Sequence, residues 1–180
     1  MKRFSGIAVF VLAAVFAATG TDTAAREKTV GMSFAYNEFS ATFTMPVKDR
    51  ETIMISANLD MSGVIPGDCL FPGVSANVAY LYEFAGITFP SGESMGFLAG
   101  PGAGVGYVRD TSGAYGAMVS LTGCIGFEYV FMVPVSISLT LEPCIGLHLS
   151  RDRFGYLSMG FYKAGLIYSL LPHLGIKYRF

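Results

Sequence analysis

Two long segments of the chain alternate apolar with small or polar residues at every second position. In the segment 115–131 the odd positions are mostly large and apolar, while the even positions are mostly Gly, Ser, Thr, Cys or Glu. The segment 135–149 repeats the pattern, with Ile137, Leu139 and Leu141 on one face. A period of two indicates a strand, because successive side chains of a strand point to opposite faces. These segments therefore predict long strands with one apolar face.

Shorter segments carry the same alternation and are separated by stretches rich in Pro, Gly and polar residues. The further predicted strands are 30–45, 53–61, 74–84, 95–107, 157–162 and 174–180, and the breaks are 46–51, 62–72, 86–93, 109–113, 132–134, 150–155 and 163–172. Eight strands joined by hairpins predict an all-β, antiparallel, up-and-down sheet. Closure into a barrel would remove the exposed edges of that sheet. The longest strands, at about 15 residues, far exceed the five or six that are typical of soluble proteins and suit a membrane crossing.

The first predicted strand changes register part of the way along. Apolar residues occupy even positions in its first half and odd positions in its second half. One extra residue reverses the faces of a strand, so we interpret 30–45 as one strand with a bulge at Asn37-Glu38. A short additional hairpin is the alternative. Pro101 and Pro143 also lie inside predicted strands and indicate local bulges, because proline lacks the donor for the ladder.

The composition indicates which face of the barrel meets water. Hydrophobic residues make up 52% of the chain and charged residues only 14%. The polar face of the strands is mostly Gly, Ser, Thr and Ala, whereas a water-facing surface normally carries many Lys and Glu. We therefore expect the apolar face to contact lipid and the polar face to fill a narrow lumen, as in a transmembrane barrel of eight strands. A soluble, lipocalin-like barrel is the alternative.

The N-terminal segment has the layout of a secretory signal peptide. Two basic residues precede an apolar run at 7–18, which is too short for a spanning helix, and small residues follow at 23–25. We expect a cleaved signal peptide at 1–25 and a barrel domain at 26–180. Cleavage near 18–20 and retention of the segment as an anchor are the alternatives.

Aromatic residues gather near the ends of the predicted strands. With the chain end placed in the periplasm, Tyr80, Tyr82, Phe84, Phe127, Tyr129 and Phe131 are expected at the outer end, and Tyr107, Tyr115, Tyr178 and Phe180 at the periplasmic end. Aromatic girdles at both interfaces are typical of membrane barrels.

The last seven residues read LGIKYRF, an alternation that ends in Phe. With the signal peptide and eight strands, the chain resembles the small bacterial outer-membrane β-barrel family of the OmpA/OmpX type. The resemblance implies a bacterial outer-membrane location, contact with outer-membrane lipid, and reading of Tyr178 and Phe180 by the barrel assembly machinery. It further implies a monomer with a structural or surface-interaction role and an unknown surface ligand.

A few charged residues share the inward face of the predicted strands. They are Glu83, Glu128, Glu142, Lys177 and Arg179. Buried charges need partners, so we expect salt bridges that plug the lumen together with the small residues. The alternative is a narrow channel for ions or small solutes, which would open when the pairs rearrange.

The pair His148 and Ser150 offers the one candidate for catalysis. It resembles the His-x-Ser element of the outer-membrane lipid A deacylase, in which a later Glu completes a hydrolytic triad. No Glu follows Ser150, and the alternation turns His148 inward. We therefore expect no enzyme and no catalytic residue, with a lipid-modifying hydrolase as the weakest alternative.

The remaining motifs do not indicate a cofactor. Cys124 and Cys144 share the inward face, where a cross-strand disulfide is conceivable, and the two His and three Cys are not spaced as metal ligands. The glycines between Gly96 and Gly106 are expected to make room for large lumen side chains. The net charge of -1 gives no basic surface for nucleic acid.

Overall fold

The computed structural model describes residues 27–61, 64, 67, 71–111, 113–151, 156–168 and 171–180. Its elements are β1 (Thr29–Phe34), β2 (Glu38–Lys48), β3 (Glu51–Asp60), β4 (Gly73–Thr88), β5 (Ser94–Arg109), β6 (Tyr115–Val130), β7 (Val135–Leu141), β8 (Cys144–Arg151), β9 (Leu157–Phe161), α2 (Lys163–Tyr168) and β10 (His173–Arg179). The predicted signal peptide and Cys69 lie outside the described residues. Among those residues, no helix has the length and hydrophobicity needed to cross a bilayer.

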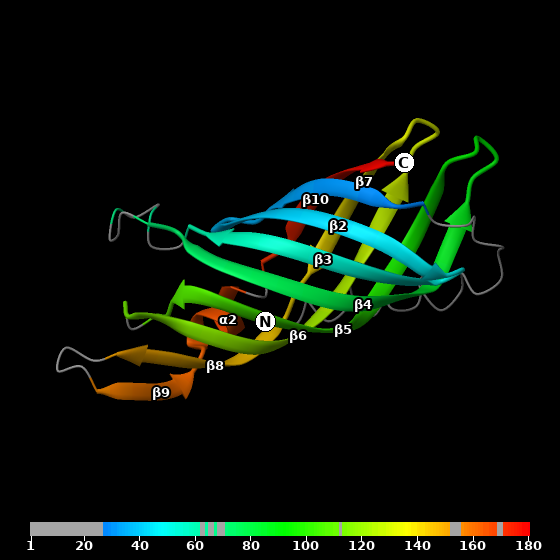
Figure 1. The fold of residues 1–180 in the computed structure, drawn as a ribbon. Coiled ribbons are helices and arrows are strands. Elements are labelled where there is room, and N and C mark those ends of the chain that lie inside the picture. Colours follow the sequence, from blue (N-terminus) through cyan, green and yellow to red (C-terminus); the bar gives the residue numbers. More distant parts are fainter. Residues whose placement is uncertain are drawn as a thin grey trace, which may run out of the picture.

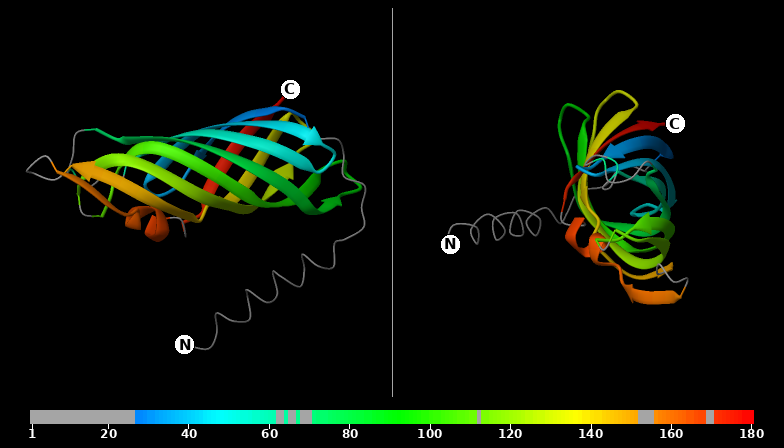
Figure 2. Two further views of the ribbon diagram at one scale, coloured as in Figure 1. Left: turned by 60° about the horizontal axis from the view of Figure 1, so that its bottom comes forward. Right: turned by 90° about the vertical axis from the view of Figure 1, so that its left-hand side faces the viewer.

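The strands form one closed antiparallel barrel, which confirms the predicted fold class (Figure 1). Strands β1 to β6 pair in chain order, and β6 then pairs with both β7 and β8. The circle closes because β10 pairs with β7 on one side and with β1 on the other. Figure 2 shows the strands as a ring with α2 at one side.

Two of the eight wall positions are shared by two strands each. β7 and β8 follow one another along β6 and are separated by Glu142 and Pro143, so the proline does interrupt its strand. β9 pairs with β8, and β10 pairs with β7, with α2 between them in the chain. The wall is therefore discontinuous where β9 leaves it and β10 enters it.

The bulge interpretation of residues 30–45 is wrong, and the additional hairpin is what forms. β1 pairs along its whole length with residues 39–44 of β2, from Thr29 with Thr44 to Phe34 with Phe39. The change of register marks a reversal of the chain, since Val30 and Phe43 thereby face the same side. The count of eight survives because the predicted strands 157–162 and 174–180 occupy one wall position.

The orientation of the side chains agrees with the expectation for a membrane barrel. On β6, Leu121 is 73% exposed on the outside, whereas its neighbour Ser120 is 3% exposed in the lumen. The same contrast separates Ile137, which is exposed, from Ser136 and Ser138, which are buried. The wall therefore presents apolar side chains outward and small polar ones inward.

The predicted grouping of the aromatic residues is wrong, although they do lie near strand ends. Because the β1–β2 hairpin adds one reversal, β4 and β6 both run toward the end of the barrel where β10 finishes, called here the terminal end. Tyr82 and Tyr129 therefore lie toward the same end as Tyr178. Tyr107 and Tyr115 stack at the other end, called here the loop end, with ring centroids 6.1 Å apart.

Candidate functional site in the barrel lumen

A buried ion pair occupies the lumen toward the terminal end. The Nζ atom of Lys177 lies 3.3 Å from Oε2 of Glu128, and both side chains are buried. Ser136 donates a hydrogen bond of 2.6 Å to Oε1 of the same carboxylate. Glu128 and Lys177 both belong to the predicted charge network, and the structure joins them as an ion pair. An ion pair with further hydrogen bonds is the arrangement in which buried charge is tolerated.

The other three predicted network residues have different surroundings. Arg179 donates hydrogen bonds of 2.8 and 2.7 Å to the carbonyl oxygens of Phe131 and Val133, and its Nη1 lies 3.7 Å from Oε2 of Glu27. Arg179 thus holds the turn between β6 and β7. Glu83 is buried beside Gly96, where its carboxyl group takes the space that a Cβ atom would need. Glu142 belongs to a second cluster, described below.

An apolar layer of buried side chains lies in the lumen. Met54, Ala79, Leu81 and Cys124 form a buried cluster, and Leu98 is also almost fully buried. The lumen therefore contains large apolar side chains in addition to the small residues and salt bridges that we expected. The sequence carried the signal, since Met54, Leu81 and Leu98 occur at positions where the alternation expects small or polar residues.

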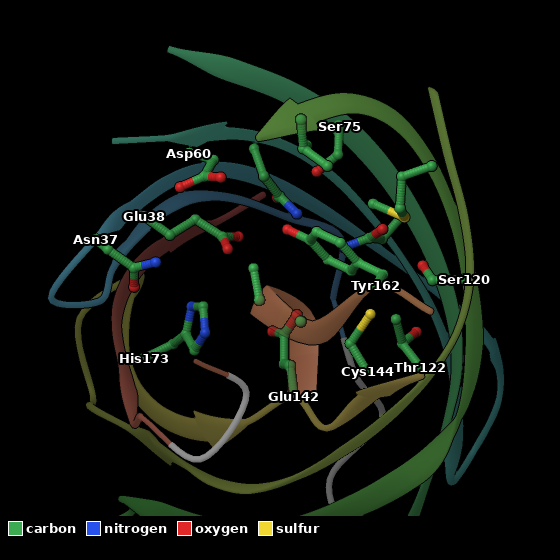
Figure 3. Close-up of a pocket in the computed structure, with 16 residues that line it drawn as sticks. Asn37, Glu38, Asp60, Ser75, Ser120, Thr122, Glu142, Cys144, Tyr162 and His173 are labelled. Carbon is green, nitrogen blue, oxygen red and sulfur yellow. The ribbon is translucent and has the colours of Figure 1, made fainter. Parts of the chain in front are cut away.

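A polar cavity of about 60 Å³ lies in the lumen at the α2 side of the barrel (Figure 3). Side chains from seven strands and from the segment around α2 converge on it. The lining residues are Asn37, Glu38, Asn58, Asp60, Ser75, Asn77, Val108, Met118, Ser120, Thr122, Glu142, Cys144, Tyr162, Ala164, Gly165 and His173. Since a water molecule needs only about 10–15 Å³, the cavity has room for several water-sized groups.

Three carboxyl groups face this cavity from two parts of the wall. Glu38 and Asp60 are direct cross-strand partners on β2 and β3, and Glu142 reaches the cavity from the junction of β7 and β8 (Figure 3). Ser40 donates to Glu38 at 3.2 Å and Thr140 donates to Glu142 at 3.5 Å. The charges of Glu142 and Asp60 act on Glu38. Like charges placed opposite one another destabilise a sheet.

Two buried polar atoms at the cavity lack hydrogen-bond partners within the described part of the chain. They are Nδ1 of His173 and Oδ1 of Asn58. Both residues line the cavity, and their exposed fractions are 5% and 3%. Buried polar groups in native proteins are almost always hydrogen-bonded, so each exception calls for an explanation.

The segment around α2 forms one side of the cavity. Asp110 accepts a hydrogen bond of 3.0 Å from the backbone N–H of Ala164 at the start of the helix. The ring of Tyr162 stacks on that of His148 with centroids 6.1 Å apart. Leu166 and Ile167 are exposed on the other side of the helix. α2 therefore lies at the discontinuity of the wall, with Ala164 and Gly165 toward the lumen.

The structure also places the remaining candidates from the sequence. His148 is buried, with its Nε2 atom 3.1 Å from the carbonyl oxygen of Val108, and Ser150 follows it on the same strand. Cys124 and Cys144 are free thiols rather than a disulfide. Within the described residues, no group of three or more His, Cys, Asp or Glu side chains is arranged to hold a metal ion.

The glycines of β5 make room, as expected, although for side chains from the neighbouring strands. A Cβ atom at Gly104 would collide with the amide of Asn77 on β4, and one at Gly102 would lie 2.5 Å from Oγ1 of Thr122 on β6. Both of these side chains line the polar cavity. Glycine on β5 is therefore part of what gives the cavity its polar walls.

Comparisons with known protein families, with curated proteins and with solved structures find no match for this chain. The arrangement of the barrel wall and of its lumen is consequently the basis for assigning a function.

Proposed function

We propose that the protein is a bacterial outer-membrane barrel of the OmpA/OmpX type with a structural or surface-interaction role and a closed lumen. Outer-membrane lipid surrounds the wall, the molecule is a monomer, and its last strand, with Tyr178 and Phe180, is read by the barrel assembly machinery. A surface ligand would be bound by the loops rather than transported.

The outer face of the barrel supports a membrane location. Exposed apolar side chains run across the wall, among them Val30, Met32, Ile55, Val78, Val105, Val119, Leu121, Ile125, Ile137, Leu147 and Ile176. A soluble monomer rarely exposes an apolar area that extends around the molecule. Acyl chains would cover this surface, and the Tyr residues toward both ends suit the headgroup regions.

The side chains that occupy the lumen carry the proposal of a structural role. The lumen contains both the apolar layer around Leu81 and Leu98 and the ion pair of Lys177 and Glu128. An ion that crosses the barrel beside these large apolar side chains would lose hydration without gaining ligands from them, which is costly. These two features favour a barrel that does not conduct ions, rather than the alternative of a channel.

Conductance across planar lipid bilayers tests this proposal. The refolded protein should insert without steady openings. The variant Leu81→Gly/Leu98→Gly should admit ions, because it removes the largest apolar side chains from the lumen. The matched variant Leu121→Gly, which changes only the outer face, should stay closed. Steady openings of the unaltered protein that change with Glu128→Ala would favour a channel.

We propose no catalytic role for His148 and Ser150. His148 Nε2 is in contact with the carbonyl oxygen of Val108 in the barrel wall. A general base would use this nitrogen to accept the proton of Ser150. Lipid A from cells that express the protein should keep its mass. A loss of acyl chains that disappears with Ser150→Ala would favour the hydrolase instead.

A further inference from the structure

We propose that the polar cavity beside α2 is a binding site for a short aliphatic ammonium compound. This inference goes beyond the structural role and does not depend on the membrane location. It rests on the charge of the cavity walls, on buried acceptors without partners, and on the mixture of polar and apolar groups that line the space.

The charge of the lining indicates a cationic occupant. Glu38 and Glu142 have no ion-pair partner among the described residues, and no Lys or Arg lines the cavity there. Glu38 and Glu142 are partly buried, and partly buried carboxylates are stabilised when a cation compensates their charge. An ammonium group in the cavity would supply that charge and up to three N–H donors.

The unpartnered atoms provide an independent indication of a ligand. Oδ1 of Asn58 can only accept hydrogen bonds, and Nδ1 of His173 accepts in one of the two neutral tautomers of the ring. Both residues are more than nine-tenths buried and line the cavity. Figure 3 shows the His173 ring turned toward the enclosed space. A ligand with N–H donors would satisfy these atoms as well as the carboxylates.

The shape of the site favours an organic cation over a bare metal ion. Glu38 and Asp60 project from one part of the wall and Glu142 from another (Figure 3), and within the described residues no ligand set for a metal is formed. Apolar groups lie among the carboxylates, including Val108, Met118 and the ring of Tyr162. Methylene groups would contact these side chains, and the aromatic ring can also attract the ammonium group.

Titration calorimetry of the detergent-solubilised protein with diaminobutane tests the proposal. Diaminobutane should bind, and butanediol, which has the same chain length and no charge, should not. Glu38→Gln and Glu142→Gln should each weaken binding by about tenfold or more, as expected for loss of a partly buried charged partner. Asp49→Asn is the matched control, because it removes an exposed carboxylate from the β2–β3 turn, and it should leave the affinity unchanged.

Labelling of the Cys144 thiol is a second readout, which locates the ligand even if Glu38→Gln or Glu142→Gln fails to fold. Cys144 lines the cavity, so diaminobutane should slow the labelling of its thiol in a protein with Cys69→Ser and Cys124→Ser. Absence of binding to the unaltered protein, equal binding of butanediol, or displacement of the diamine by Mg²⁺ at equal concentration would each overturn the proposal. None of these results bears on the conductance, so the two proposals can fail separately.

Discussion

At the scale of single residues, the charged side chains of the lumen form two different arrangements. Lys177 and Glu128 are held together with Ser136, whereas Glu38 and Glu142 face one another across a cavity. The first arrangement stiffens the barrel, because each charge keeps a fixed partner. The second leaves negative charge available to something that enters the cavity.

Removal of the buried ammonium group should destabilise the barrel strongly. We expect Lys177→Met to lower the free energy of unfolding by about 3–5 kcal/mol, because the Glu128 carboxylate stays buried without that cation. Urea unfolding in detergent micelles measures the change. Glu27→Gln, which removes the partly exposed partner of Arg179, should cost less than about 1 kcal/mol. Equal losses for both variants would show that burial of the pair does not matter.

Gly165 should be intolerant of a side chain. A Cβ atom there would lie 2.5 Å from Cδ1 of Tyr162 and 3.1 Å from Sγ of Cys144. We expect Gly165→Ala to cost about 1–3 kcal/mol, as for overpacking elsewhere, measured by the same urea unfolding. Gly160→Ala is the control, because nothing lies within 4 Å of the added atom. A neutral Gly165→Ala would mean that α2 packs less closely than described.

At the scale of elements, the alternation predicted most of the strands, because a strand with one apolar face requires apolar residues at every second position of the sequence. It did not distinguish a bulge from a hairpin at Asn37-Glu38, since both reverse the faces of the residues that follow. That choice depends on pairing between β1 and β2, which only the folded barrel supplies. The sequence also did not predict that β9 and β10 share one wall position, because that too depends on which strands pair in the folded barrel.

The interrupted wall position should be the least stable part of the sheet. Within the part of the chain that the structure describes, β9 pairs only with β8, and all five of its residues are exposed. β5 and β6, in contrast, pair with neighbours on both sides. We expect the amides of Leu157–Phe161 to exchange with solvent much faster than those of β5, as measured by hydrogen exchange in micelles. Equal protection would show that something covers the free edge of β9.

At the scale of the whole molecule, the sequence predicted the closed barrel and the direction of its faces. It did not predict the contents of the lumen in the same detail. Glu128 and Lys177 lie far apart in the chain, as do Glu38 and Glu142, and only the order of the strands around the barrel decides which of them meet. Glu142 was accordingly placed with Lys177 by the sequence and with Glu38 by the structure.

The central claim is that the apolar outer face contacts lipid, and a nitroxide label on that face tests it most directly. The label is attached through Leu121→Cys, in a protein whose own cysteines are replaced by Ser, and the protein is reconstituted into lipid bilayers. We expect the label to collide often with dissolved oxygen and rarely with a water-soluble nickel chelate, whereas a label at Asp49→Cys should show the reverse. Frequent collision of the Leu121→Cys label with the nickel chelate would contradict the membrane orientation.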